Sequence, residues 1–436
     1  MALFGLQLPL NQLHVFKKFT RILLFVALVL FRPIGGFTPT GGLSSQTIRS
    51  LVQNRFGDDL LKGKVIVITG ATGGLGRELC RVCTDRNLAA KMVVALDVNE
   101  EALKELQREL TTTSSSSSSS SSHTQDDDDD NNNLQTIVAD HSNLDSVAVA
   151  AATILQSHDK IDLLVNNAGI WYPFDDAQVE RADVSAQGYD LLFSINYLSG
   201  FLLTQLLLPA MRSGNDGGAR MVHVVSTKHW QVDGSSLLPN NNSSSSNNNN
   251  SSNPVASRSG KDRIATHVED SYANSKLAQL WHARALSRKS NGLQCVCACP
   301  SWAATGIAGD HPNGEVLTKF AYATQDCGPA ITSTLNAMFR TEEELKNCIV
   351  GDATTYVANS RVWTNLLPPW KQLWVTSKVV APFRSRIVAF CTTVILLTQR
   401  WFHDDFILQE TSPESCDMEC QDAFYEWSLE AVKPWL

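Results

Sequence analysis

Apolar residues of this chain recur in short β-branched runs, and the stretches between those runs carry apolar residues at helical spacing. This alternation of strands and helices is typical of a parallel, doubly wound α/β sheet with helices on both faces. No linker separates a second apolar core, so we expect one domain. The expected strands are residues 64–69, 91–96, 135–139, 161–165, 220–226 and 293–299, and the expected helices are residues 77–82, 99–110, 144–156, 188–211 and 272–288.

Two segments interrupt the periodic pattern. Residues 111–133 and about 234–262 are dominated by serine, aspartate and asparagine runs with little apolar content. Such a composition cannot offset the entropy lost on ordering. We therefore predict two disordered, low-complexity insertions on the surface of the domain.

The first 60 residues are interpreted as a leader. Basic residues precede the apolar run 22–31, which is shorter than the roughly twenty residues that cross a bilayer. A basic region, a short apolar region and the small pair Gly35-Gly36 indicate a targeting signal. Residues 37–42, led by Phe37, resemble the junction of two-part plastid presequences in algae with secondary plastids. An uncleaved anchor on the endoplasmic reticulum membrane is the alternative, and both locations stay open; a plain disordered tail is a third interpretation.

Composition and charge exclude several classes. With 436 residues and 43% hydrophobic residues, the chain can bury a full core. The net charge of −8 is dominated by the acidic run 126–130, and no basic stripe indicates nucleic-acid binding. Ten cysteines in a chain of this length do not form a disulfide scaffold. Cys295, Cys297 and Cys299 alternate along one strand and are interpreted as buried apolar residues, not metal ligands, because no histidine pair at ligand spacing accompanies them.

A glycine cluster follows the first expected strand. The chain turns at Gly70, Gly74 and Gly76, where a ligand can approach the backbone closely, and a helix begins there. Free N–H groups and the positive end of the helix dipole suit a pyrophosphate. Taken alone, the spacing also fits a structural turn in another α/β unit.

Four motifs occur in order along the chain: Thr69-Gly70-x-x-x-Gly74-x-Gly76, Asn166-Asn167-Ala168-Gly169, Ser226 and Tyr272-x-x-x-Lys276. Together they resemble those of the short-chain dehydrogenase/reductase family, and residues 188–209 and 424–428 are similar to its retinol-dehydrogenase-like branch. The resemblance implies a Rossmann-type sheet of about seven strands within residues 61–436.

The tyrosine and the lysine of the last motif suit acid–base chemistry. Tyr272 and Lys276 are four residues apart and share one helix face. At about 4 Å and an effective dielectric of about 20, an ammonium stabilises a phenolate by about 4 kcal/mol. Half of that lowers the pKa of a tyrosine from about 10 toward neutrality. Ser226 would hold the substrate oxygen, and the resemblance adds Asn196 to the proton relay. The alternative is an exposed helical pair.

Asp97 favours NAD as the cofactor. It ends the second strand, where a carboxylate accepts both ribose hydroxyls and repels a 2′-phosphate. NADP is the alternative cofactor. The alternative role of Asp97 is to cap the helix that begins near Asn99.

The resemblance implies further cofactor contacts. Asp140 and His141 match the adenine-contacting position, and the loop from Pro300 to Thr305 matches the one that holds the carboxamide, with Ser301 in place of a glycine. His223 replaces a usual asparagine and is expected in the packing. The remaining expected cofactor-binding residues are Thr69, Thr72, Leu75, Asn167, Ala168, Gly169, Tyr272 and Lys276.

We therefore expect an NAD(P)-dependent oxidoreductase that moves hydride between the nicotinamide and an alcohol or carbonyl carbon. Two alternatives remain: a catalytically idle protein that senses dinucleotides or acts as a scaffold, and a dehydratase or epimerase on the same fold. Residues 306–403 are expected to form a substrate lid whose aromatic residues suit a lipophilic alcohol, aldehyde or ketone, unless they cover the sheet or face a membrane. The apolar run 387–397 is interpreted as a core or homodimer-interface helix.

Overall fold

The structure is a computed structural model, and part of the chain is described by it. The leader segment 1–44, most of the two insertions, the run 387–397 and the aromatic residues between 363 and 374 lie outside the described residues. The described residues are 45–115, 133–171, 184–212, 218–238, 268–290, 292–300, 303, 305–308, 327–341, 343–344, 355–358, 407–408 and 411–436.

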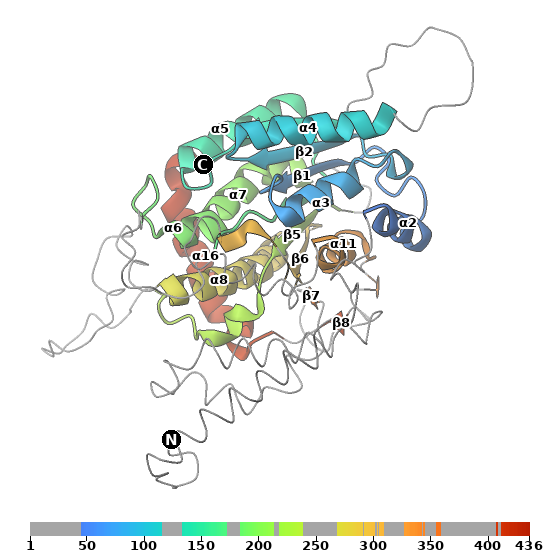
Figure 1. Cartoon of the computed structure of the whole chain (residues 1–436). Coiled ribbons are helices and arrows are strands. Elements are labelled where there is room, and N and C mark those ends of the chain that lie inside the picture. Colours follow the sequence, from blue (N-terminus) through green and yellow to red (C-terminus); the bar gives the residue numbers. More distant parts are fainter. Residues whose placement is uncertain are drawn as a thin grey trace, which may run out of the picture.

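One eight-stranded sheet organises these residues, in the order β3-β2-β1-β4-β5-β6-β7-β8 (Figure 1). Strands β1 to β7 are parallel to their neighbours, and the short β8 pairs antiparallel with β7. The expected doubly wound parallel sheet is confirmed. The strands are β1 Val65–Thr69, β2 Met92–Asp97, β3 Leu134–Val138, β4 Leu163–Asn166, β5 Arg220–Val224, β6 Gln294–Cys299, β7 Thr355–Ala358 and β8 Ile407–Leu408.

The strand order reverses direction between β1 and β4. The chain winds outward from β1 to β3, then returns to place β4 on the other side of β1. In such sheets the crossovers diverge at this point, and a crevice opens beyond the carboxyl ends of the strands. The glycine turn after β1 lies at that place.

Helices cover both faces of the sheet (Figure 1). Residues of α5, α7, α8 and α16 pack with one face, and residues of α2, α3, α4 and α11 pack with the other. The helices of these layers are α2 Ser45–Phe56, α3 Gly74–Cys83, α4 Glu100–Ser115, α5 Leu144–Ser157, α7 Ser199–Arg212, α8 Val268–Lys289, α11 Thr332–Phe339 and α16 Met418–Val432.

Alternation along the strands assigns each side chain to one of the two faces. Val65 and Val67 pack toward the α7–α8 side, whereas Ile66 and Ile68 pack toward α3. The cysteines Cys295, Cys297 and Cys299 of β6 are all buried on the α7–α8 side. Their expected role as buried apolar residues on one face is confirmed.

Three predicted boundaries are wrong. Within the predicted leader, residues 45–56 form α2, whose Val52 is 4% exposed and packs with the α3-side core. Helix α4 continues to Ser115, inside the first predicted insertion, because neither glycine nor proline interrupts it. Leu237, inside the second, is buried in the α7–α8 core because it offers an apolar side chain among the serines.

The described part of the predicted lid also differs from expectation. Within residues 306–403, α11 packs on β5 and β6, and Thr355–Ala358 forms strand β7. Leu335 and Met338 of α11 are buried in the α3-side core. This part of the segment covers and extends the sheet, which is the alternative that the sequence had left open.

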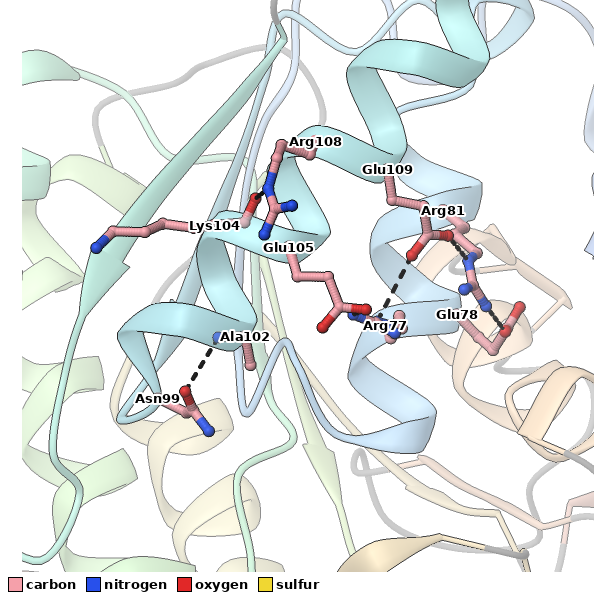
Figure 2. A network of polar contacts seen from close by, with 9 residues as sticks. All are labelled: Arg77, Glu78, Arg81, Asn99, Ala102, Lys104, Glu105, Arg108 and Glu109. Atoms are coloured by element: carbon pink, nitrogen blue, oxygen red, sulfur yellow. Dashed lines mark hydrogen bonds and ion pairs between the residues drawn. The ribbon is translucent and has the colours of Figure 1, made fainter.

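Charged residues join α3 and α4 on the surface (Figure 2). Arg77 pairs with Glu105 at 3.3 Å and with Glu109 at 3.7 Å, and Arg81 pairs with Glu109 at 2.6 Å. These residues are partly exposed, so each pair contributes about 1 kcal/mol or less. The network orients α3, whose N-terminus faces the crevice.

One helical segment in the described part of the chain is long and apolar enough to cross a membrane. It runs from Leu191 to Arg212, with a mean hydropathy of 1.6, and 78% of its most apolar window is buried. It comprises α6 (Leu191–Phe193), a π-helical turn (Ser194–Leu198) and α7. Its burial identifies it as a core helix of the domain.

Candidate active site

The glycine turn brings β1 against the residues that follow β4. Gly70 has a φ of +63°, and a Cβ there would lie 2.9 Å from the Cα of Ala168. At Gly76 a Cβ would lie 2.0 Å from the Gly70 carbonyl oxygen. Glycine is therefore required at both positions, for the left-handed backbone at Gly70 and for the close approach at Gly76.

Two residues lock the ends of β1 and β4 together. The Thr69 hydroxyl accepts hydrogen bonds from the backbone N–H groups of Asn167 (3.0 Å) and Ala168 (2.9 Å). The Asn167 amide donates to the carbonyls of Thr69 (2.9 Å) and Gly70 (3.1 Å). Residues 69–70 and 167–168, which we call the floor of the site, are held rigidly because the ends of β1 and β4 are hydrogen-bonded to each other.

Helix α3 starts directly above the floor and presents backbone donors. Its N-cap residue, Gly73, has no side chain to cap the first turn, and that turn contains no acidic residue. The N–H groups of Gly74, Leu75 and Gly76 belong to this first turn, where the helix dipole favours an anion. The turn fits the pyrophosphate of a dinucleotide.

Asp97 connects the turn to the end of β2. Its Oδ2 accepts a hydrogen bond from the Thr72 N–H at 3.0 Å, and its Oδ1 accepts one from the Asn99 N–H at 3.1 Å. Helix α4 is capped by another residue, since Asn99 Oδ1 accepts from the Ala102 N–H at 3.0 Å. Asp97 is therefore not merely a helix cap: it also fixes the conformation of the glycine turn.

Asp140 and His141 follow β3 at the same edge. Asp140 Oδ1 accepts hydrogen bonds from the Ser142 N–H (2.8 Å) and hydroxyl (2.7 Å). His141 Nδ1 lies 2.8 Å from the Ser199 hydroxyl, which itself donates to the Ile195 carbonyl, so Nδ1 carries the proton. Burial lowers the pKa of His141 to about 4, so the ring is neutral at physiological pH.

Asn196 lies on the π-helical turn between α6 and α7. Its side chain binds the backbone of Ile170, accepting from the N–H at 2.8 Å and donating to the carbonyl at 3.0 Å. The Asn196 carbonyl accepts a hydrogen bond from the Gln279 amide of α8 at 2.8 Å. Single π-helical turns are frequent at functional sites because they re-aim such groups.

Tyr272 and Lys276 both lie on α8 and are buried, at 6% and 3% exposure. The predicted shared face is confirmed, since the Lys276 ammonium lies 5.5 Å from the centre of the Tyr272 ring. Lys276 Nζ donates to the Val224 carbonyl of β5 at 3.0 Å. The alternative of an exposed helical pair is wrong.

The pKa of Tyr272 is shifted in the direction opposite to our expectation. Burial raises it, and a hydrogen bond with Ser226 opposes that rise. Burial lowers the pKa of Lys276 to about 8. The expected lowering of the Tyr272 pKa by Lys276 is not seen, because desolvation of the phenolate dominates and the ammonium hydrogen-bonds to a backbone carbonyl.

Ser226 follows β5 and is held by its neighbour His229. His229 Nδ1 donates to the Ser226 carbonyl at 2.6 Å, and its Nε2 accepts from the Ser412 N–H at 3.3 Å. His229 is fully buried. The Ser226 hydroxyl accepts a hydrogen bond from the Lys228 N–H at 3.3 Å, and its interaction with Tyr272 acts to lower the pKa of that tyrosine.

The loop after β6 reaches the glycine turn. Pro300 is buried, and the Thr305 N–H donates to the Ala303 carbonyl at 2.9 Å. A Cβ at Gly74 would lie 3.1 Å from Thr305 Cγ2, so Thr305 is adjacent to the start of α3. Ser301 lies outside the described residues.

The four predicted catalytic residues converge at this edge. Gly169 is the common neighbour: a Cβ on it would lie 3.2 Å from Asn196 Oδ1 and 3.6 Å from Lys276 Nζ. Ser226 and Tyr272 complete the group from β5 and α8. Contacts between any of these residues and a cofactor stay predictions.

Sequence reasoning missed three supporting residues. Gln279 lies one helical turn after Lys276, and that spacing could have indicated a shared face. His229 follows Ser226 by three residues on a short 3₁₀ helix that no pattern predicts. Trp171, whose ring centre lies 5.7 Å from that of Tyr272, follows the Asn-Ala-Gly motif but comes close only in the fold.

His223 is fully buried, as expected. Its Nε2 lies 3.0 Å from Nδ1 of His282, and burial lowers the pKa of both rings. Among the described residues, no three histidine, cysteine or acidic side chains are grouped so that they could hold a metal ion.

Comparison with known proteins agrees with this geometry. Residues 64–233 match the short chain dehydrogenase family model. Dehydrogenase/reductase SDR family member 7B of Bos taurus is 32% identical over 179 residues, 41% of this chain and 47% of that protein. Retinol dehydrogenase 14 of Mus musculus is 30% identical over 218 residues, 47% of this chain and 56% of that protein. The chain thus spans about half the length of the curated relatives it matches.

Among solved structures, a short chain dehydrogenase of Shigella flexneri complexed with NADP has 18% sequence identity and a TM-score of 0.45. The similarity covers 69% of this chain and 98% of that one. The similarity to short chain dehydrogenases thus rests on residues 64–233, which include the glycine turn, the Asn-Ala-Gly motif and Ser226.

Proposed function

We propose that this protein is an NAD(P)-dependent oxidoreductase that interconverts an alcohol and a carbonyl compound, with Tyr272 as the acid and base. One observation carries the proposal: Lys276, whose ammonium lies 5.5 Å from the centre of the Tyr272 ring, and Asn196 flank Gly169 at the edge of the sheet where Ser226 follows β5. The bound nicotinamide would supply or accept the hydride.

The residues at the switch point fit a dinucleotide. The uncapped first turn of α3 offers backbone donors to the two phosphates. Asp97 ends β2 on one side of this turn, and Asn167, Ala168 and Gly169 bring backbone to the other side. Side chains of Asp140 and His141 border the end of β3, where an adenine would lie.

The protonation states favour carbonyl reduction at neutral pH. Since burial raises the pKa of Tyr272, its hydroxyl holds a proton and can donate it to a carbonyl oxygen. Ser226 donates a hydrogen bond that fixes the same oxygen. Lys276, with a pKa of about 8, is mostly charged at pH 7 and stabilises the phenolate left after proton transfer.

Replacing the hydroxyl tests the proposal directly. In Tyr272→Phe, kcat should fall by about 10² to 10⁴, the range for a general acid, while NADH still quenches protein fluorescence. Tyr425→Phe is the control, because Tyr425 bonds Gln205 on α7 and lies outside the site. Wild-type turnover in Tyr272→Phe would refute the mechanism, and NADH binding without turnover of any carbonyl by the wild type would support the idle alternative.

The preference for NAD rests on Asp97. Its carboxylate would meet the 2′-phosphate of NADP with a like charge, so Asp97→Arg should shift the ratio of the NADH and NADPH dissociation constants toward NADPH. Asp97→Asn keeps the shape and removes the charge, and we expect an intermediate ratio. An unchanged ratio in both variants would limit Asp97 to orienting the Thr72 backbone.

The substrate is proposed to be a lipophilic alcohol, aldehyde or ketone, as for a retinol-dehydrogenase-like protein. The local identity to retinol dehydrogenase 14 and the aromatic residues between 363 and 374 support this class. A chain-length series of aldehydes tests it: kcat/KM should rise with chain length. A flat series, or a preference for charged substrates, would contradict it.

The location and assembly are proposals from the sequence alone. Residues 1–44 would direct the protein to a plastid or to the endoplasmic reticulum membrane, where they could associate with the bilayer. Sequencing the mature N-terminus separates removal of a leader from retention of an anchor. Sedimentation of the purified protein tests the proposed homodimer.

A further inference from the structure

Cys416 is an exposed thiol close to a buried guanidinium. It ends the 3₁₀ helix η8 (Pro413–Cys416), just before α16. Its Sγ lies 3.8 Å from both the Thr411 hydroxyl and the Ser412 carbonyl. Thr411 and Ser412 are buried, so the thiol lies at the rim of a polar cluster beneath the surface.

Arg284 of α8 points into this cluster. The residue is 7% exposed, and its Nη2 donates to the Thr411 hydroxyl at 2.8 Å. Its Nε and Nη1 atoms are buried and have no hydrogen-bond partner among the described residues. Burying a guanidinium without an anionic partner is costly, so these free N–H groups call for an anion beside them.

The Cys416 thiolate can supply this anion. Burial raises the pKa of the Cys416 thiol, but the neighbouring Arg284 guanidinium and the Thr411 and Ser415 hydroxyls outweigh burial, so the pKa is lowered. Glu414 and Asp417 flank the thiol in the chain, and one Glu414 carboxylate oxygen is also buried without a hydrogen-bond partner among the described residues. A thiolate beside an arginine at an accessible position is nucleophilic.

We propose that Cys416 is a modification site, a thiol activated by Arg284 that forms mixed disulfides with small disulfides such as glutathione disulfide. The Cys416 thiolate attacks one sulfur, a new S–S bond forms, and the original S–S bond breaks. The other half leaves as a thiolate, which takes a proton from solvent. One disulfide is consumed and one is formed, so no further oxidant is needed.

Five other cysteines of the described chain have raised pKa values. Burial raises the pKa of Cys80, Cys83, Cys295 and Cys297, so these thiols are inert. Cys420, one helical turn beyond Cys416, has its pKa raised to about 11 by burial and by Asp417. Cys420, which is half-buried, is thus an internal comparison for a thiol without activation.

A consequence for the active site follows from the contacts of η8. Ser412, whose carbonyl contacts Cys416, donates its N–H to His229, and His229 donates to the Ser226 carbonyl. A bulky group on Cys416 would displace Ser412 and with it the support of Ser226. This consequence rests on the proposed function, whereas the modification itself does not.

The modification is tested on the full chain with glutathione disulfide at pH 7, followed by peptide mass spectrometry. Cys416 should be modified at least about tenfold faster than Cys420, because one pKa unit changes the thiolate fraction tenfold. Arg284→Met should slow modification of Cys416 about tenfold, and Thr411→Val, which keeps the charge and removes one hydroxyl, should slow it less. Equal rates at Cys416 and Cys420, or an unchanged rate in folded Arg284→Met, would overturn the proposal.

Wild-type protein alone also gives an answer if Arg284→Met fails to fold. The pH profile of iodoacetamide alkylation at Cys416 should have its midpoint below the usual thiol value of about 8.5, and that of Cys420 above it. A Cys416 midpoint at or above that value would contradict the proposal. For the active site, glutathione disulfide should lower carbonyl reduction in the wild type and not in Cys416→Ser. Modification without loss of turnover would overturn the coupling only.

Discussion

Helices α3 and α8 border the same crevice from opposite faces of the sheet, and they differ in what they bury. The buried side chains of α3 belong to the apolar core on its side of the sheet; they are Leu79, Cys80, Val82 and Cys83. Along α8, apolar residues such as Leu277 and Trp281 alternate with buried polar residues. The buried polar residues of α8 include Lys276, Gln279, His282 and Arg284.

This difference follows from what each helix offers to a ligand. Helix α3 presents backbone N–H groups at its N-terminus, so its side chains are free to form an apolar core. Helix α8 presents side chains, and each buried polar group then needs a partner from another element. Lys276 finds it on β5, Gln279 on the π-helical turn, and His282 in His223.

The largest expected effect lies where α3 approaches β1. Gly76→Ala would place a methyl group 2.0 Å from the Gly70 carbonyl oxygen, a backbone atom that cannot rotate away. We expect a loss of about 3 kcal/mol or more in the free energy of unfolding, measured by urea denaturation.

Gly200→Ala on α7 is the matched control on the other face. Its Cβ would lie 3.3 Å from Asn166 Oδ1, an atom without a hydrogen-bond partner among the described residues, so this contact is much less close than the one at Gly76. A better helix propensity, about 1 kcal/mol, offsets that contact, so stability should change little. If both variants lose the same stability, close packing of α3 is not what distinguishes the two faces.

The sequence predicted the α3 side of this comparison better than the α8 side. Glycine spacing and a β-branched run specify a strand, a turn and a helix locally, so the floor made by Gly70 and Gly76 could be anticipated. Tyr272 and Lys276 were placed by a local spacing of four. Their partners Val224 and Ser226 could be placed only through the resemblance, because no local pattern fixes which strand lies beneath α8.

What could not be predicted depends on long-range contacts. The pKa of Tyr272 depends on how deeply α8 is buried, and this burial cannot be predicted from the local sequence. Helix α2 was included in the leader because its amphipathic pattern is weak, and only the packing of Val52 shows that it belongs to the domain. Likewise, the role of α11 as a cover of the sheet follows from its contacts with β5 and β6.

An effect of intermediate size is expected on the stability of the protein at low pH. Burial lowers the pKa of His282 to about 3, below the unfolded value of about 6.5. The unfolded chain therefore binds more protons between these values, and the neutral ring contributes stability above pH 6.5 that is lost as the pH falls. In His282→Phe the unfolded chain no longer binds a proton at this position. The slope of the unfolding free energy against pH should therefore decrease by up to about 1.4 kcal/mol per pH unit.

The measurement is urea denaturation between pH 7 and pH 4. At pH 7 the variant should itself be less stable by about 1–3 kcal/mol, because His223 Nε2 loses its partner. Cys80→Ala on α3 removes no group that titrates in this window, so its curve should run parallel to that of the wild type. A parallel curve for His282→Phe would show that the buried polar groups of α8 do not set the acid sensitivity.

The smallest expected effect concerns positioning. Gln279 donates to the carbonyl of Asn196, which lies on the π-helical turn. Gln279→Met keeps the volume and removes the donor, so the turn should relax and Asn196 should lose its fixed grip on Ile170. We expect kcat for carbonyl reduction to fall about tenfold, equivalent to about 1.4 kcal/mol, with KM for the cofactor unchanged.

Gln205→Met is the comparison variant. Gln205 donates to the Tyr425 hydroxyl and not to Asn196, so this variant should leave kcat unchanged. A purely structural role for Gln279 would lower the unfolding free energy and leave kcat of the folded fraction intact. A positioning role lowers kcat while the far-ultraviolet spectrum and cofactor binding stay the same. The second outcome would mean that the polar residues buried along α8 are retained because they hold the reacting side chains in place, which α3 accomplishes with backbone alone.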